Sequence, residues 1–125
     1  MPDNIALLES FFEAYNRKDF EAMRRMMTPD AEMAAYNRGA AYRTRDELLA
    51  ALPLFANHLA PDRKASNAIR VTAQQNVVVR EYDFSGTATV DIHNMAMKGE
   101  RFTLRLCSVF RFNDEGLIVE WRDHG

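Results

Sequence analysis

The sequence of 125 residues has one cysteine, little net charge and no long apolar run. Because Cys107 stands alone, a disulfide within the chain is impossible, and a zinc site built on cysteines is not expected. The formal net charge is -2, which gives no basic surface for nucleic acid or an anionic membrane. The basic residues are scattered, and we interpret the adjacent pairs Arg24-Arg25 and Arg63-Lys64 as solvated surface. No apolar run approaches the roughly 20 residues that a membrane-spanning helix needs.

Sequence signals for cofactors are missing as well. No glycine-rich phosphate loop or nucleotide fingerprint occurs. His58, His93 and His124 lie far apart and form no metal-binding motif, so we expect neither a metal nor another cofactor. Cys107 has no neighbouring base to activate it as a nucleophile. The chain does not begin with a basic stretch that leads into an apolar run, and we expect a cytoplasmic protein.

What the sequence does contain is ordinary for a globular protein, with 47% hydrophobic residues. Its length predicts a single domain across residues 1–125. Apolar residues at helical spacing predict a first helix over residues 3–15, with Asp3 as its cap. A shorter second helix is predicted over residues 19–27, and Pro29 should stop it.

A capping box at residues 44–47 opens a third predicted helix, which Pro53 should end or kink. Strands are predicted over residues 31–36, 69–73, 77–84, 101–112 and 117–122. Residues 87–95 are predicted to extend the strand of residues 77–84 or to form a further strand. Helices followed by consecutive strands indicate an α+β fold. We expect three N-terminal helices packed on a strongly curved antiparallel or mixed β-sheet, with a cone-shaped pocket between them.

The alternation of side chains along the strands predicts which polar groups face this pocket. Ser108 on the long strand and Asp123 after the last strand fall on the apolar faces. On the middle strand, Arg80 and Tyr82 share the face that carries the larger apolar side chains. An inward Arg80 needs a carboxylate, and Asp123 is the candidate. Burial disfavours the charged form of a carboxylate, which suits Asp123 to act as a general acid or base.

Each of these residues also has a purely structural interpretation. Ser108 is then a small core residue bonded to a neighbouring backbone group. Asp123 then lies in solvent past the rim of the sheet or ties down a helix terminus, and the guanidinium of Arg80 reaches the rim.

Three segments resemble the SnoaL-like polyketide cyclases of the nuclear-transport-factor-2-like superfamily. Residues 11–20 (FFEAYNRKDF) resemble the helical start of these proteins. Residues 98–102 (KGERF) and 109–118 (VFRFNDEGLI) resemble their late hairpin. The resemblance covers nearly the whole chain and implies the fold rather than a particular reaction.

Residues 120–124 (EWRDH) are similar to the Trp-Arg-Asp segment of limonene-epoxide hydrolases. In that family an Asp-Arg-Asp set activates water and protonates the epoxide oxygen. The resemblance places Asp123 on one aspartate and Arg80 on the arginine, whereas Tyr82 stands where the second aspartate belongs. Tyr36 partly matches a tyrosine on the first strand of the family.

This superfamily also includes SnoaL-type cyclases and steroid isomerases. SnoaL-type cyclases use an acid-base aspartate in an apolar pocket, which Asp123 together with His93 resembles. Steroid isomerases have polar or acidic groups where this chain has Tyr36, Phe11 and Ser108, and these departures argue against isomerase chemistry.

The first hypothesis is a small cofactor-free enzyme that acts on an apolar oxygenated molecule, as an epoxide hydrolase or a polyketide-cyclase-like enzyme. The catalytic residues in this hypothesis are Asp123, which moves a proton, Arg80, which polarises that carboxylate, and Tyr82, which donates a hydrogen bond. The residues that we expect to contact the substrate are Tyr15, Tyr36, Ser108, Trp121 and His93.

The alternative is a non-catalytic domain of the same fold, which uses the pocket for a small hydrophobic ligand or the open sheet face for dimerisation. The tyrosine at position 82 in place of a second acid favours this alternative. A role in assembling a larger complex is a third interpretation. We expect a homodimer, because helices should leave one face of the sheet uncovered.

Overall fold

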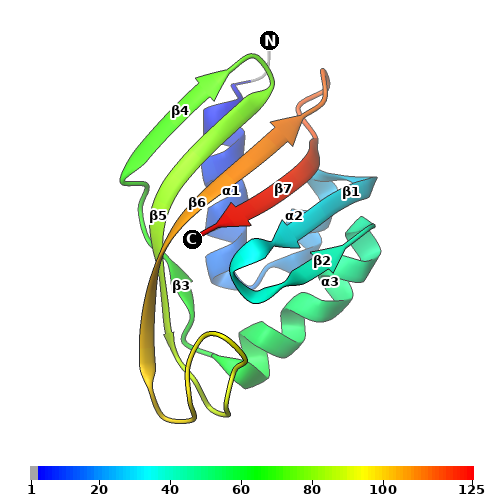
Figure 1. The fold of residues 1–125 in the computed structure, drawn as a ribbon. Helices are drawn as coiled ribbons and strands as arrows, with labels where there is room; N and C mark the ends of the chain where they lie inside the picture. The colour runs from blue at the N-terminus through cyan, green and yellow to red at the C-terminus, as the bar shows by residue number, and fades with distance from the viewer. Residues whose placement is uncertain (1–2) are drawn as a thin grey trace.

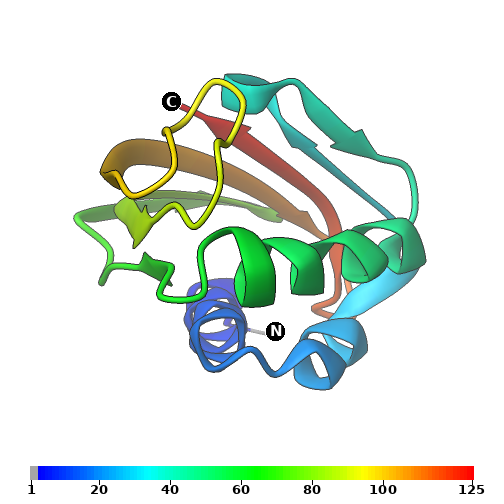
Figure 2. The ribbon, with the colours of Figure 1, turned by 90° about the horizontal axis from the view of Figure 1, so that it is seen from below.

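The structure, a computed structural model, describes residues 3–125 of the chain. Three helices cover one face of a seven-stranded sheet, as Figures 1 and 2 show. The helices are α1 (Asn4–Arg17), α2 (Phe20–Arg25) and α3 (Arg45–Leu54). The strands are β1 (Met27–Ala35), β2 (Ala40–Tyr42), β3 (Lys64–Ala65), β4 (Arg70–Gln74), β5 (Val77–Thr87), β6 (Arg101–Phe112) and β7 (Ile118–His124). Two short helical turns, η1 (Tyr36–Arg38) and η2 (Phe55–Leu59), follow β1 and α3.

The sheet is mixed and curved. Its strands lie in the order β2-β1-β7-β6-β5-β3, and β4 also pairs with β5. β1 and β7 are parallel, and the other pairs are antiparallel. The sheet bends around the helices along the long strands β5 and β6 (Figure 1). This architecture confirms the predicted α+β fold with three helices on a curved mixed sheet.

The helices begin at the predicted capping residues. The side chain of Asp3 accepts a hydrogen bond from the Ala6 amide at 3.1 Å. Asp19 caps α2 and Thr44 caps α3 in the same way, each at 3.1 Å from its backbone donor. Each cap satisfies a backbone N–H that has no partner within the helix.

The second and third helices end differently from the prediction. α2 ends at Arg25, and Met27 and Pro29 belong to β1 rather than to the helix. Pro29 fits there because it lies where the pairing with β7 shifts, between Met27 and Glu32, and no ladder bond needs its missing N–H. α3 includes Pro53 and ends at Leu54, one residue beyond the proline that was predicted to end or kink it, and the chain then widens into the π-helical turn η2.

Two strand predictions need correction. β5 extends only to Thr87, and residues 88–100 form a loop with one isolated bridge between Ile92 and Ala96, so the predicted strand over residues 87–95 is largely absent. β7 carries a bulge, because Phe112 pairs with Ile118 whereas Arg111 pairs with Glu120. The bulge turns Ile118 into the core, whereas strict alternation from Trp121 and Asp123 would place it on the outer face.

Aromatic side chains join α1 to the inner face of the sheet. The Phe11 ring lies 5.5 Å from that of Trp121, and Trp121 stacks on Phe110 at 5.1 Å between centroids. Phe12 meets Tyr82 at 5.0 Å. These edge-to-face and stacked contacts fix α1 on strands β5 to β7. Among the described residues, no helix is long and apolar enough to cross a membrane.

Candidate active site

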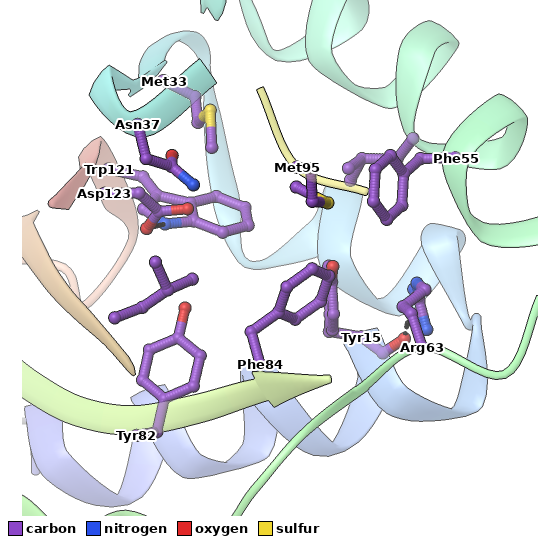
Figure 3. A pocket seen from close by; sticks show the side chains of 12 residues that line it. Tyr15, Met33, Asn37, Phe55, Arg63, Tyr82, Phe84, Met95, Trp121 and Asp123 are labelled. Carbon is purple, nitrogen blue, oxygen red and sulfur yellow. Dashed lines mark hydrogen bonds between the residues drawn. The ribbon is translucent and has the colours of Figure 1, made fainter. Parts of the chain in front are cut away.

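A pocket opens between the inner face of the sheet, the end of α3 and the loop of residues 88–100 (Figure 3). Its lining residues are Tyr15, Met33, Asn37, Leu52, Phe55, Arg63, Tyr82, Phe84, Met95, Leu106, Trp121 and Asp123. The cavity measures about 40 Å³, which is room for about three water molecules. A larger ligand therefore has to displace side chains, and the flexible side chain of Met95 is suited to move.

Asp123 is the acidic group of this pocket and is only 7% exposed. Its Oδ1 atom accepts a hydrogen bond from Trp121 Nε1 at 2.5 Å and another from Ser108 Oγ at 2.5 Å. Two donors on one oxygen fix the orientation of the carboxylate and offset part of the cost of its burial.

Ser108 connects Asp123 to Tyr82. The Tyr82 hydroxyl lies 2.8 Å from Ser108 Oγ. Ser108 has a single hydroxyl hydrogen, which it donates to Asp123, so Tyr82 must donate to Ser108. The three side chains form a chain of hydrogen bonds that ends on the carboxylate.

Burial raises the pKa of the Tyr82 hydroxyl well above its usual value, and the negative charge of Asp123 raises it further. The hydrogen bond with Ser108 acts in the opposite direction with a smaller effect. Tyr82 therefore stays protonated at neutral pH and keeps its proton available for the bond to Ser108.

The sheet register brings these groups together. Arg80 pairs with Ser108 across β5 and β6, Ser108 pairs with Asp123 across β6 and β7, and Asp123 pairs with Ala35 of β1. Paired residues of neighbouring strands point to the same face. Arg80, Ser108 and Asp123 are all buried on the inner face, as the alternation along each strand predicted.

The expected ion pair between Arg80 and Asp123 is not formed, which corrects that part of the prediction. Arg80 instead binds Glu9 of α1 through Nε and Nη2, at 2.8 and 3.0 Å, and the Ser66 carbonyl at 3.0 Å. Its guanidinium also lies over the Phe12 ring at 4.1 Å. Arg80 does not line the pocket, and its geometry fits a residue that holds α1 to β5.

The other predicted site residues divide into two groups. Tyr15 and Trp121 line the pocket, and Ser108 lies behind it in contact with Asp123. Tyr36 is 58% exposed and packs on His124, with 4.9 Å between ring centroids. His93 is exposed in the loop of residues 88–100. Neither Tyr36 nor His93 lines the pocket, because β1 ends before Tyr36 and no strand forms at His93.

Arg63 was predicted to be solvated surface, and the structure corrects this prediction. Arg63 is 4% exposed and lines the pocket. It follows the turn after η2, and Ala60 accepts its backbone N–H at 3.0 Å. The local sequence gives no signal for this burial, because it results from the packing of this turn against Gly86 of β5.

The pocket offers an acid-base group in an apolar setting. Of the described residues that line it, Asp123 carries the only carboxylate. Side chains with O–H or N–H donors in the described lining are Tyr15, Asn37, Arg63, Tyr82 and Trp121, and Trp121 donates to Asp123. Residues 3–125 contain no group of three His, Cys, Asp or Glu side chains placed to hold a metal ion.

The fold and this site define a small α+β domain with a carboxylate at an internal pocket. The sequence matches the SnoaL-like domain over residues 8–121. The chain therefore belongs to the SnoaL-like family. No curated protein sequence matches it.

Solved structures with the same fold share little sequence with this chain. A candidate polyketide cyclase from Xanthomonas campestris pv. campestris has a TM-score of 0.82 at 22% identity, over 98% of this chain and 89% of its own. IdmH, a candidate polyketide cyclase from Streptomyces antibioticus, has a TM-score of 0.78 at 21% identity, over 98% and 91%. A LEH-like epoxide hydrolase from M. tuberculosis has a TM-score of 0.74 at 19% identity, over 96% and 80%. At these identities the likeness establishes the fold alone.

Proposed function

We propose that the protein is a cofactor-free acid-base enzyme that moves a proton on a small apolar molecule bearing a carbonyl or similar oxygen. The observation that carries this proposal is the buried Asp123 carboxylate, held at the pocket by Trp121 and Ser108. A positioned carboxylate that is poorly solvated is a better base than one in water. The names of the structural neighbours, polyketide cyclases among them, are consistent with such chemistry.

In the proposed reaction Asp123 removes a proton from a carbon next to the substrate carbonyl and returns it at another atom. Trp121 and Ser108 keep the carboxylate in place during both transfers. Tyr82 supports Ser108 by donating to it. The apolar lining, which includes Leu52, keeps bulk water from the reacting atoms. General acid-base catalysis of this kind contributes roughly 10²–10⁴ in rate.

Among the described lining residues Asp123 is the single carboxylate, which favours proton transfer over epoxide hydrolysis. One group that takes a proton and gives it back is enough for a cyclase or isomerase. Hydrolysis of an epoxide needs one group to activate water and another to protonate the oxygen. The buried Arg80 and the partly exposed Glu9 bind each other away from the pocket.

The test is the replacement Asp123→Asn, which keeps the shape of the side chain and removes its basicity. Wild-type protein and variant are incubated in D₂O with small cyclic ketones and β-keto esters, and exchange of the α-hydrogen is followed by NMR. A parallel panel of cyclic epoxides is assayed for diols. We expect turnover in the carbonyl panel, and a loss of about 100- to 10,000-fold in kcat for Asp123→Asn.

Asp83→Asn is the matched control, because Asp83 lies on the outer face of β5 and binds Arg105. It should leave the rate unchanged. Equal rates for Asp123→Asn and wild type would remove Asp123 from the mechanism.

A second candidate is a binding domain that uses the pocket without chemistry. The absence of a second acid among the described lining residues favours it. If no substrate in either panel turns over, and Asp123→Asn binds the same compounds as tightly as wild type, the binding role replaces the enzymatic one.

A further inference from the structure

Arg63 is a second charged group in the pocket, at the opposite end from Asp123. Figure 3 shows Asp123 beside Trp121 at one side of the lining and Arg63 beside Tyr15 and Phe55 at the other. The pocket thus has a negative end and a positive end, with apolar side chains such as Phe84 between them.

Part of the Arg63 side chain has a structural role. Nη2 donates to the Tyr15 carbonyl at 2.7 Å, near the C-terminal end of α1, and the same carbonyl accepts the Lys18 amide at 3.1 Å. The guanidinium also lies 4.0 Å from the centroid of the Tyr15 ring, a favourable cation–π distance. These contacts orient the side chain but leave its charge without an anion.

The other terminal nitrogen of the guanidinium is unsatisfied. Nη1 of Arg63 is buried and has no hydrogen-bond partner in the described part of the chain. Within residues 3–125, none of the ion pairs involves Arg63. A buried charge is costly unless it is paired, and a buried N–H is costly unless it is bonded.

Arg80 provides the contrast within the same molecule. It is also buried, but Glu9 neutralises it through two hydrogen bonds, and it lies outside the pocket lining. Nη1 of Arg80 also lacks a hydrogen-bond partner among the described residues, so the two arginines differ in their charge. Arg80 is paired with Glu9, whereas Arg63, which faces the pocket, has no anion beside it in the described part of the chain.

We infer that Arg63 binds a carboxylate of the ligand, so that the pocket takes a small, mostly apolar carboxylic acid. A carboxylate supplies both the acceptor that Nη1 lacks and the negative charge that the guanidinium lacks, whereas a neutral carbonyl supplies only the acceptor. The bound acid would place its uncharged end toward Asp123, since two carboxylates repel each other. This inference rests on the proposed function only for the role of Asp123. It defines the substrate class as carboxylic acids whose uncharged end carries the proton that Asp123 moves.

The test compares straight-chain carboxylates from butanoate to octanoate with the corresponding amides at pH 7.5. Trp121 is the single tryptophan and lines the pocket, so its fluorescence reports binding directly. We expect at least one carboxylate of the series to bind tenfold or more tightly than its amide in the wild-type protein. This comparison needs no variant and is therefore independent of any effect of substitution on folding.

Variants then identify the positively charged residue that binds the carboxylate. Arg63→Gln should abolish the preference for the acid over the amide, and Arg63→Lys should retain part of it. Arg101→Gln removes an arginine whose side chain is 64% exposed and should leave the preference unchanged. Circular dichroism confirms that each variant is folded before binding is measured.

Several outcomes contradict the inference. If acids and amides bind equally to wild type, if none of the series binds, or if folded Arg63→Gln keeps the full preference, Arg63 only caps α1. Asp123→Asn separates the acid-base mechanism from the carboxylate site at Arg63. This variant should lose turnover and still bind the acid more tightly than the amide. Turnover that survives in Asp123→Asn refutes the proposed mechanism and leaves the carboxylate site standing.

Discussion

At the scale of single residues, Ser108 is the centre of the buried hydrogen-bond chain. It is fully buried, donates to Asp123 and accepts from Tyr82. Ser108→Ala removes a donor from Asp123 and leaves the Tyr82 hydroxyl without its acceptor. Tyr82→Phe removes one hydroxyl together with its own bond. Because an unsatisfied buried group costs more than a lost bond, we expect a loss in the free energy of unfolding of about 2 kcal/mol for Ser108→Ala and about 1 kcal/mol for Tyr82→Phe.

Urea denaturation of both variants measures this difference. Ser85→Ala on the outer face of β5 is a suitable control, since it removes a half-buried hydroxyl away from the pocket. A smaller loss for Ser108→Ala than for Tyr82→Phe would contradict the direction of the hydrogen bonds.

Tyr82 also predicts how stability depends on alkaline pH. Its pKa is raised in the folded protein by burial and by Asp123, above the ordinary value of 10.0. The neutral phenol therefore contributes its full stabilisation below about pH 10, and this contribution declines as the pH rises above that value. Above about pH 10 we expect the free energy of unfolding to fall faster with pH in the wild type than in Tyr82→Phe. The two slopes should differ by up to about 1.4 kcal/mol per pH unit.

Thermal denaturation between pH 8 and pH 11 checks this prediction, and ultraviolet absorbance follows ionisation of the four tyrosines. Complete tyrosine ionisation in the folded protein near pH 10 would show that Tyr82 is not shielded as the geometry requires.

At the scale of elements, Gly86 allows the turn that carries Arg63 to approach β5. A Cβ atom at position 86 would lie 3.2 Å from Arg63 Cα and 3.0 Å from Phe102 Cζ. The Asp62 side chain holds the same turn by accepting the Thr87 amide at 2.8 Å. The backbone therefore cannot move aside easily.

We expect Gly86→Ala to destabilise the protein by about 1–3 kcal/mol, the usual range for overpacking. Alanine in a strand would otherwise gain about 0.5–1 kcal/mol over glycine, so the steric effect must exceed that gain. The variant should also weaken the preference for carboxylates, because Arg63 moves with its turn. Urea denaturation and the fluorescence titration measure the two effects, and a stabilised variant would show that the contact is not tight.

The elements that the sequence predicted well are those defined by local rules. Caps at Asp3, Asp19 and Thr44 mark the helix starts, and alternation identifies β6 over its full length. Predictions failed where a distant partner decides the structure. The loop of residues 88–100 has strand-like composition but no neighbouring strand to pair with, and the bulge in β7 depends on its register with β6.

The same division applies to the site. Asp123, Ser108 and Tyr82 were predicted to face inward because a period of two determines the face of a strand. The partner of Arg80 was not predictable, because Glu9 lies 71 positions away on a helix face that looks solvated in sequence. The burial of Arg63 likewise depends on contacts with α1 and β5 rather than on its neighbours in the chain.

At the scale of the whole molecule, one face of the sheet carries no helix (Figure 2). Alternating charges cover its strands and pair with one another. Arg105 binds Asp83 at 2.6 Å, and Arg122 binds Glu32 at 3.2 Å. Half-buried Val109 and Cys107 lie among these pairs on β6. Surfaces that carry both signs of charge are self-complementary about a twofold axis, so we propose that a second copy of the chain covers this one.

This homodimer predicts two measurable effects. Sedimentation equilibrium should give a dimer at micromolar concentration that weakens at high salt, because exposed ion pairs are screened. Val109→Arg should shift the protein to monomer, whereas Val90→Arg in the exposed loop should not. Cys107, the single thiol, should react with thiol reagents faster on dilution, since dissociation uncovers it. A monomer at every concentration, or a Cys107 reactivity that does not change on dilution, would contradict the dimer and show that this face of the sheet stays exposed to solvent.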